Sequence, residues 1–391
     1  MRRFLLILAV IAVGSLGVVT AATAAGGKGG STRSAAPSLL VPDASVTYHP
    51  AAGAADVNPA SPVSVTVEDG TFEQVSLTDP DGDVVAGALN AEKTVWTASE
   101  PLGYGTAYTW TGVASGADGV QVPVRGAFRT VAPSKAVRGV INIGDGRTVG
   151  IAAPVEIQFN SHVEDRAAVE RALGVQTSTP VEGAWGWLPD ENGGSRVHWR
   201  PKQYWPANTE VTVTAKLYGV AYGGGEYGAA DIASTFRIGR AQIVKADARS
   251  FQMVVERDGK QVASYPASYG LASDPNRNTR SGVHVVTEKF TDKRMISAQY
   301  GYDVVEKWAV RMSNNGEFIH ANPASTGAQG SSNVTHGCVN LSIDNAKAYY
   351  DTALYGDPVE VTGTPVQLSS KDGDVWDWTL SWDRWRTLSA L

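Results

Sequence analysis

The chain has one cysteine, Cys338, within the motif Thr-His-Gly-Cys-Val-Asn at positions 335–340. A lone cysteine cannot form an internal disulfide, so it is either a small buried apolar residue or a thiol retained for its reactivity. Two histidines accompany it: His336 within the motif, and His320 at the end of the run Phe-Ile-His at positions 318–320. The neighbouring glycine favours a reactive thiol, because backbone N–H groups can approach a substrate oxygen there.

A cysteine attacks a carbonyl group as the thiolate, which needs a nearby base or cation and a dipolar pocket for the oxyanion. His320 is the better candidate for the base, because a strand-like run would hold its ring rigidly. The polar, turn-rich segment 321–335 is long enough to bring His320 back to Cys338. The pattern predicts a thiol acyl-enzyme catalyst, and proteases and acyltransferases both remain open.

The same three side chains, His320, His336 and Cys338, are also zinc ligands by type. Structural zinc sites use four ligands, usually in paired close spacing, and the sequence lacks that pattern. We therefore expect no metal and no cofactor. The remaining histidines lie in segments without a comparable motif: His49, His162, His198 and His284.

The N-terminal segment predicts export from the cytoplasm. Residues 1–25 combine two arginines, an apolar run and the small-residue sequence Ala-Thr-Ala at positions 22–24, which is typical of a cleaved signal peptide. An uncleaved membrane anchor is the alternative, because the apolar run is just long enough to span a bilayer. Residues 26–45 are rich in Gly, Ser and Ala and predict a flexible linker. We expect contact with the membrane only through this N-terminal segment.

Charge excludes a nucleic-acid partner. The formal net charge is −6, and the 33 basic and 39 acidic residues are spread thinly, without a basic block. Export together with a single cysteine also means that disulfides do not stabilise the fold.

The body of the chain is predicted to be mainly β. Residues 46–132 and 133–240 contain short alternating runs separated by turns, which is typical of β-sandwich domains. Trp96 and Trp199 are each followed by threonines at the same two offsets, which indicates an internal repeat. Pro133 and Gly239 mark the expected hinges between blocks.

Residues 241–364 form a third predicted domain. An Asp-Gly turn at 258–259 predicts a β-hairpin, and the spacing of apolar residues predicts a helix over 344–355, capped by Ser342 and ended by Gly356. Residues 365–391 contain a cluster of tryptophans that could bind glycan. We favour a buried clip that packs this extension on the third domain, because tryptophan buries a large apolar area.

The motifs at 318–320 and 335–340 resemble the signature of L,D-transpeptidases with a YkuD-type catalytic domain. Residues 279–284, Thr-Arg-Ser-Gly-Val-His, lie where this family has Thr-Pro-x-Gly, with Arg280 in place of the proline. The resemblance covers nearly the whole chain after the N-terminal segment. It implies two immunoglobulin-like β-sandwich domains, a β-rich catalytic domain with one or two short helices, and a Trp-rich C-terminal tail.

The resemblance implies a peptidoglycan L,D-transpeptidase that works outside the cytoplasm. The donor is a tetrapeptide stem that loses D-Ala, the acceptor is a second stem peptide, the product is a 3→3 cross-link, and carbapenem β-lactams are the expected inhibitors. The implied roles are Cys338 as nucleophile, His320 as general base and acid, His336 and Gly337 as the oxyanion hole, Ala321 as the carbonyl that orients His320, and Tyr300, Tyr302, Trp308, Asn340 and Gly282 as substrate contacts.

Other functions remain as alternatives. An L,D-carboxypeptidase would use water as acceptor on the same fold, and a non-catalytic protein could bind the cell wall through its tryptophans. A sortase needs an arginine shortly after the cysteine, and none occurs between Cys338 and Arg384. A papain-like protease has its nucleophile before its histidine, whereas His320 comes first.

Overall fold

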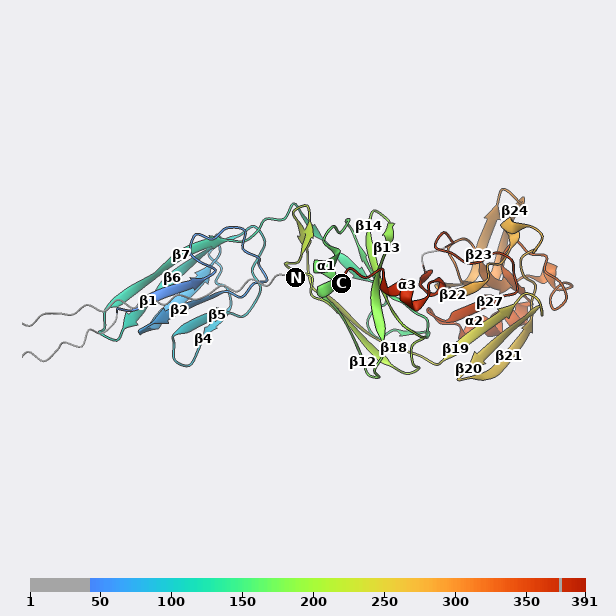
Figure 1. The fold of residues 1–391 in the computed structure, drawn as a ribbon, viewed down its shortest axis with the longest axis horizontal. Coiled ribbons are helices and arrows are strands. Elements are labelled where there is room, and N and C mark those ends of the chain that lie inside the picture. Colours follow the sequence, from blue (N-terminus) through green and yellow to red (C-terminus); the bar gives the residue numbers. More distant parts are fainter. Residues whose placement is uncertain (1–42, 373–374) are drawn as a thin grey trace, which may run out of the picture.

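The computed structural model describes residues 43–372 and 375–391, which form three β-rich domains in a row (Figure 1). The prediction of a mainly β fold is confirmed. The predicted signal or anchor segment, 1–25, and nearly all of the predicted linker, 26–45, lie outside the described residues. Within the described ranges, no helix has the length and apolar character needed to cross a membrane.

The first domain consists of two sheets, with strand orders β1-β2-β5-β4 and β3-β6-β7. Alternation along β2 buries Val65 and Val67 between the sheets, as expected for a strand with one face in a core. Trp96 and Trp110 meet edge to face at 5.2 Å in this core. The strands are β1 (Ser45–His49), β2 (Ser64–Glu68), β3 (Gly70–Thr78), β4 (Gly87–Leu89), β5 (Val95–Ala98), β6 (Ala107–Gly116) and β7 (Gln121–Arg129).

The second domain has sheets of order β10-β18-β15-β12 and β13-β14-β11-β9, and a small sheet β16-β17-β8. Trp199 lies on β14, as Trp96 lies on β5, and it stacks on Trp205 at 4.8 Å. The elements are β8 (Lys135–Val137), β9 (Gly139–Ile141), β10 (Thr148–Val149), β11 (Val155–Phe159), α1 (Arg166–Arg171), β12 (Leu173–Thr177), β13 (Gly183–Glu191), β14 (Gly194–Pro201), β15 (Glu210–Ala215), β16 (Ala221–Gly223), β17 (Glu226–Gly228) and β18 (Ile232–Ile238).

The third domain combines a sheet of order β21-β20-β19-β27-β22 with a sheet of order β23-β24-β25-β26. Its elements are β19 (Gln242–Asp247), β20 (Gln252–Arg257), β21 (Lys260–Pro266), η1 (Pro275–Arg277), β22 (Gly282–Val285), β23 (Glu288–Ser297), β24 (Tyr302–Arg311), β25 (Phe318–Ala321), η2 (Pro323–Ser325), β26 (Val339–Leu341), α2 (Ile343–Thr352) and β27 (Pro358–Thr362). The tail adds η3 (Asp377–Thr379) and α3 (Trp382–Arg386). The β20–β21 pairing confirms the predicted hairpin, with Asp258 and Gly259 at positive φ in its turn.

The predicted helix begins where expected and ends early. Ser342 caps α2 through its side-chain oxygen, which accepts a hydrogen bond from the Asn345 N–H. The helix ends at Thr352 because Ala353 takes an extended backbone conformation. The chain then turns so that Asp357 accepts a hydrogen bond from the Leu354 N–H and reaches Arg240. A buried ion pair therefore overrides the apolar spacing that predicted helix as far as residue 355, about one turn further.

Contacts cross both expected hinges. Between the first two domains, Tyr104 Oη donates to the Gly228 carbonyl at 2.7 Å and accepts from the Gly219 N–H at 2.9 Å. Between the second and third domains, the Arg240 guanidinium binds both oxygens of buried Asp357, at 3.0 and 2.7 Å. Bidentate Arg–carboxylate pairs fix orientation as well as distance. These contacts favour a defined arrangement of the domains over free hinges.

The C-terminal extension packs on the third domain, as expected, but packs mainly on the second domain, which the sequence did not predict. Its first part lies on the third domain, where Ser281 forms backbone hydrogen bonds with Val366 and Leu368, both at 2.8 Å. The Trp385 indole N–H donates to the Ala184 carbonyl at 2.9 Å, and Trp378 donates to Ala152 at 2.9 Å. Asp377 is fully buried and accepts from His198 at 2.9 Å. Figure 1 shows the C-terminus beside α1 of the second domain.

The residues of β13 and β14 that receive the tryptophans of the tail, which we call the seat, explain this placement. A Cβ atom on Gly186 would lie 2.9 Å from the Trp385 ring, so only glycine leaves room for the indole. Arg200 of β14 lies over the rings of Trp378, Trp382 and Trp385, at 4.7, 5.5 and 5.0 Å from the ring centres. Cation–π contacts of a desolvated arginine stabilise such a cluster.

Replacing Trp385 with alanine should therefore destabilise the second domain and its tail by about 3–5 kcal/mol, the usual cost of removing a fully buried tryptophan. Urea unfolding monitored by tryptophan fluorescence measures this change. Trp382→Ala is the matched control, because Trp382 is only half-buried and should cost clearly less. Equal losses in the two variants would contradict the proposed seat.

Candidate active site

A parallel strand pair brings the two ends of the motif-bearing segment together. β25 pairs with β26 so that His320 lies opposite Asn340 and Ile319 lies opposite Val339. Parallel strands need a long connection, and residues 322–338 supply it as a loop that includes η2. Cys338 immediately precedes β26. The sheet therefore places the imidazole and the thiol side by side, although the sequence separates them.

Cys338 is half-buried and lines a cavity of about 340 Å³. Its Sγ lies 3.6 Å from the Gly316 carbonyl oxygen, within reach of a thiol donor. The cavity lies between the β23–β24 hairpin and the 322–338 loop. Its lining residues are Met295, Tyr302, Val304, Glu306, His320, Asn322, Ala324, Ser325, Val334, Thr335, His336, Cys338 and Asn340.

His320 is held in one orientation by its Nδ1 atom. This nitrogen donates to the Ala321 carbonyl at 2.9 Å and lies 3.6 Å from Glu306 Oε2, which leaves Nε2 for Cys338. Burial alone would lower the pKa of His320. Hydrogen bonds with Cys338 and Glu306, the charge of Cys338 and the Ala321 carbonyl outweigh burial and raise this pKa to about 10.

This pKa makes the imidazolium the stable form of His320 at neutral pH. A protonated histidine beside a cysteine suits a thiolate–imidazolium pair, the reactive state of many thiol acyltransferases. The arrangement can attack a carbonyl carbon and then deliver a proton to the departing group. It is therefore a complete nucleophile–acid pair.

The turn from Thr335 to Cys338 is stabilised by hydrogen bonds of the Thr335 side chain. Thr335 Oγ1 donates to the Cys338 carbonyl at 2.7 Å and accepts from the Gly337 N–H at 3.4 Å. Gly337 has a φ of +116°, which residues with a side chain rarely adopt. An oxyanion site needs backbone N–H groups that point at the substrate oxygen, and the Gly337 N–H would have to leave Thr335 to serve as one. Thr335 was not singled out from the sequence, although it lies within the motif.

The side chain of His336 belongs to the hairpin side of the cavity. Its ring lies 4.4 Å from that of Tyr300 and 5.5 Å from that of Tyr302. Burial and the neighbouring Arg277 charge lower the pKa of His336, so its ring is neutral at neutral pH. Arg277 also holds the loop, donating to the Thr335 carbonyl at 3.2 Å.

The other residues predicted as substrate contacts divide into two groups. Tyr302 and Asn340 line the cavity, and Asn340 Oδ1 is buried with no hydrogen-bond partner in the described part of the chain. Trp308 packs on Tyr350 of α2 at 5.3 Å, and Gly282 lies on β22 against Leu368; neither is among the described residues that line the cavity. Their roles in binding stay predictions.

Strand alternation along β24 would have identified Glu306 from the sequence. A local break in this alternation explains why the Trp308 side chain points away from the cavity. Tyr302, Val304 and Glu306 follow one another at a period of two on β24, so all three face the cavity. A positive φ of 55° at Trp308 then breaks the alternation. Counting in twos from Tyr302 was therefore enough to find Glu306, whereas the irregular backbone at Trp308 had no signal in the sequence.

Within residues 43–372 and 375–391, no group of three or more His, Cys, Asp or Glu side chains is arranged to hold a metal ion.

Comparison with known proteins places these features in a family. Residues 241–361 match the L,D-transpeptidase catalytic domain, and residues 54–221 match the bacterial Ig domain. The chain is 56% identical over 351 residues to L,D-transpeptidase 5 of Mycobacterium tuberculosis, covering 90% of this chain and 78% of the relative. It is 37% identical over 363 residues to L,D-transpeptidase 2 of the same species, covering 90% and 86%.

A solved structure of an L,D-transpeptidase in complex with imipenem has 33% sequence identity and a TM-score of 0.49, covering 59% of this chain and all of that one.

Replacing Glu306 with glutamine should lower the pKa of His320, because it removes a carboxylate that stabilises the imidazolium. The titration midpoint of the His320 ring, followed by NMR, should move to lower pH. The charged or titratable groups that face this ring are Glu306, Cys338 and, one step away, Tyr302. Glu288→Gln, at the open end of the hairpin where this exposed carboxylate pairs with Arg311, is the control and should leave the midpoint in place. An unchanged midpoint in Glu306→Gln would contradict this assignment.

Proposed function

Because the chain belongs to the L,D-transpeptidase family, we propose that it forms 3→3 cross-links in peptidoglycan through an acyl-enzyme on Cys338. The observation that carries this proposal is the fixed imidazole of His320, anchored by the Ala321 carbonyl and Glu306, beside a thiol that opens into a cavity. A wall-binding protein has no need of such a pair.

In the first half-reaction, the Cys338 thiolate attacks the carbonyl of the third residue of a donor tetrapeptide. The new C–S bond places negative charge on the carbonyl oxygen, which the backbone N–H groups at His336 and Gly337 stabilise. The Gly337 N–H must then exchange its hydrogen bond with Thr335 Oγ1 for one with this oxygen. The C–N bond to D-Ala then breaks, and the His320 imidazolium gives its proton to the leaving amine. The products are a thioester on Cys338, free D-Ala and a neutral His320.

In the second half-reaction, neutral His320 acts as a base. It accepts a proton from the side-chain amine of an acceptor stem as that amine attacks the thioester carbonyl. Collapse of the tetrahedral intermediate breaks the C–S bond and regenerates the thiolate–imidazolium pair. A water molecule in place of the amine would give a tripeptide, which is the carboxypeptidase reaction.

The lining of the cavity suits an extended peptide. Met295 and Val304 provide apolar surface, while Asn322 and the unpartnered Oδ1 of Asn340 provide polar groups that can orient a backbone. Most small-ligand sites combine an apolar wall with a few directed polar groups. A volume of about 340 Å³ fits the reacting part of a stem peptide and not the whole muropeptide.

A β-lactam presents a strained amide carbonyl to the same thiolate. Opening of its ring by Cys338 would leave a thioester with no separate leaving group, so the acyl-enzyme would persist. We therefore propose carbapenems as covalent inhibitors that acylate Cys338.

Peptidoglycan lies outside the cytoplasmic membrane, so this enzyme acts there. We propose that residues 46–132 and 133–240 form a stalk that carries the catalytic domain, 241–364, at a set distance from the predicted linker, 26–45. The contacts of Tyr104 and Arg240 across the two junctions support a stiff stalk.

The decisive experiment incubates the protein with a disaccharide-tetrapeptide and follows the products by mass spectrometry. The wild-type protein should give a dimer that lacks one D-Ala. Cys338→Ala should give none, because no thioester can form, and Thr335→Val is the matched variant that retains the nucleophile and should only slow the reaction.

The other products separate the alternatives. A tripeptide monomer without dimer would assign the carboxypeptidase reaction. Dimer formation by Cys338→Ala would exclude the cysteine mechanism. Binding without any product from the wild-type protein would favour the wall-binding alternative.

A further inference from the structure

A buried carboxylate lies directly behind the proposed oxyanion turn. Glu317 is 4% exposed, and a Cβ atom on Gly337 would lie 3.7 Å from Glu317 Cγ and 3.9 Å from Glu317 Oε1. A negative charge at this distance opposes the charge that develops on a substrate oxygen at the turn, because water screens buried charges poorly. The acylation step therefore needs something to neutralise Glu317.

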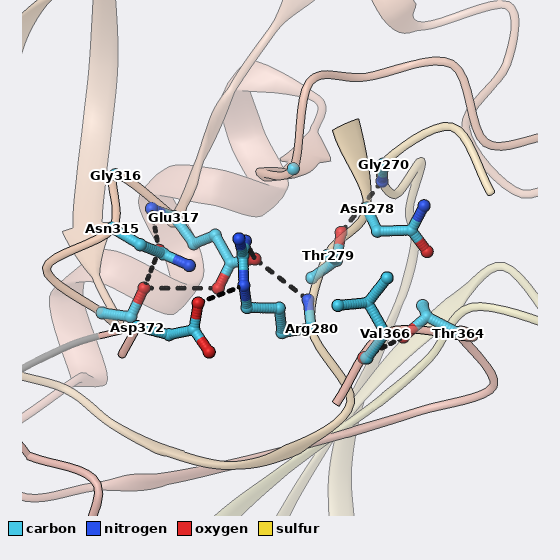
Figure 2. A network of polar contacts seen from close by, with 12 residues as sticks. Gly270, Asn278, Thr279, Arg280, Asn315, Gly316, Glu317, Thr364, Val366 and Asp372 are labelled. Atoms are coloured by element: carbon cyan, nitrogen blue, oxygen red, sulfur yellow. Dashed lines mark hydrogen bonds and ion pairs between the residues drawn. The ribbon is translucent and has the colours of Figure 1, made fainter. Parts of the chain in front are cut away.

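Arg280 supplies the neutralising charge. Its backbone N–H and its guanidinium both donate to Glu317 Oε1, at 2.9 and 3.2 Å. Figure 2 shows the arginine side chain between Glu317 and Asp372. Removing one partner of a buried ion pair leaves an uncompensated charge, which costs far more than the pair contributes.

The same network holds the loop whose carbonyl faces the thiol. Gly316, with a φ of +98°, lies between Asn315 and Glu317, and its carbonyl is the group 3.6 Å from Cys338 Sγ. The Asn315 side chain accepts from the Glu317 N–H at 3.2 Å. The Ser313 hydroxyl donates to Glu317 Oε2 at 3.2 Å, so both carboxylate oxygens are held.

The C-terminal extension completes this network. Asp372 Oδ1 lies 2.6 Å from Arg280 Nε, and the Asp372 carbonyl accepts from the Asn315 N–H at 3.2 Å. Ser369 fixes the second carboxylate oxygen through its N–H and hydroxyl, at 2.9 and 2.6 Å. A segment seated mainly on the second domain thus contributes an anchor to the wall of the active site.

We propose that Arg280 is a positioning residue for acylation, which neutralises Glu317 behind the oxyanion turn and is itself held by Asp372 of the C-terminal extension. This inference rests on the proposed acyl-enzyme. The polar contacts of the Arg280 side chain are with Glu317 and Asp372, so it acts on the thiol through Glu317 and the 315–317 loop.

Two substitutions of Arg280 separate charge from packing. Arg280→Lys keeps the positive charge, and Arg280→Gln replaces it with a shorter, neutral side chain that can still donate hydrogen bonds. Arg280→Gln should slow acylation about tenfold, because it removes the guanidinium from Glu317 near the oxyanion and leaves only His284 Nδ1, 3.7 Å from Glu317 Oε2, as a group that could carry a positive charge there. Arg280→Lys should stay within about threefold of wild type. Adding Glu317→Gln to Arg280→Gln should restore most of the lost rate, since no carboxylate then lies behind Gly337, although Asp372 keeps its charge.

The measurement is acylation of Cys338 by 4-nitrophenyl acetate, read from released 4-nitrophenolate. This ester transfers its acetyl group to a reactive thiol whatever the natural substrate is, so it tests Arg280 even if the wild-type protein makes no cross-linked dimer. Alkylation of the same thiol by iodoacetamide forms no oxyanion and should stay within about twofold in every variant. Lys245→Ala removes a surface ion pair of the same domain and is the control for stability.

Each outcome has one meaning. Slow acylation by Arg280→Gln with recovery in Arg280→Gln/Glu317→Gln supports the proposal. Equal acylation by wild type and Arg280→Gln, or no recovery in the folded double variant, overturns it. Absence of dimer from a wild-type protein that is acylated by the ester overturns the proposed function and leaves the role of Arg280 standing.

Discussion

The parallel pairing of β25 with β26 is the constraint on which the site depends. It sets His320 opposite Asn340 and therefore fixes the imidazole beside the residue that precedes β26, Cys338. A slip of one residue would point both side chains to the other face of the sheet. The buried apolar side chains of both strands oppose such a slip, because Ile319, Val339 and Leu341 are fully buried. The packing of these apolar side chains thus determines the relative positions of His320 and Cys338.

The sequence predicted those residues of the site that lie within a recognisable motif. The family resemblance identified Cys338 and His320, and the alternating patterns identified the β-rich domains, because these features depend on local order along the chain. Glu306 was accessible by strand alternation from Tyr302. The partners of Arg280 were not accessible, since Glu317 and Asp372 come from distant segments and only the tertiary fold brings them together. The same reason explains why the contact of the tail with the second domain was not predicted. Its seat there consists of Gly186 on β13 and Arg200 on β14, and neither residue carries a local signal in the sequence.

The domains are linked by polar contacts as much as by apolar ones. Asp357, which follows the early end of helix α2, pairs with Arg240. Asp377 in the tail is buried against His198 of the second domain. Buried ion pairs contribute little net stability but strongly penalise other arrangements, in which one charge is left alone. Such contacts are therefore suited to fixing one relative orientation of catalytic domain, tail and stalk.

In the reaction that we propose, two carboxylates near the site have opposite effects, and their surroundings account for the difference. Glu306 faces His320, where a negative charge stabilises the imidazolium that must later release its proton to the leaving amine. Glu317 lies behind Gly337, where a negative charge opposes the oxyanion, and there Arg280 neutralises it. In the proposed first half-reaction, the site holds the Cys338 thiolate, then the oxyanion of the tetrahedral intermediate, and neither of them once the thioester has formed. Glu306 can therefore stabilise the His320 imidazolium, while Arg280 keeps the charge of Glu317 from opposing the thiolate and the oxyanion.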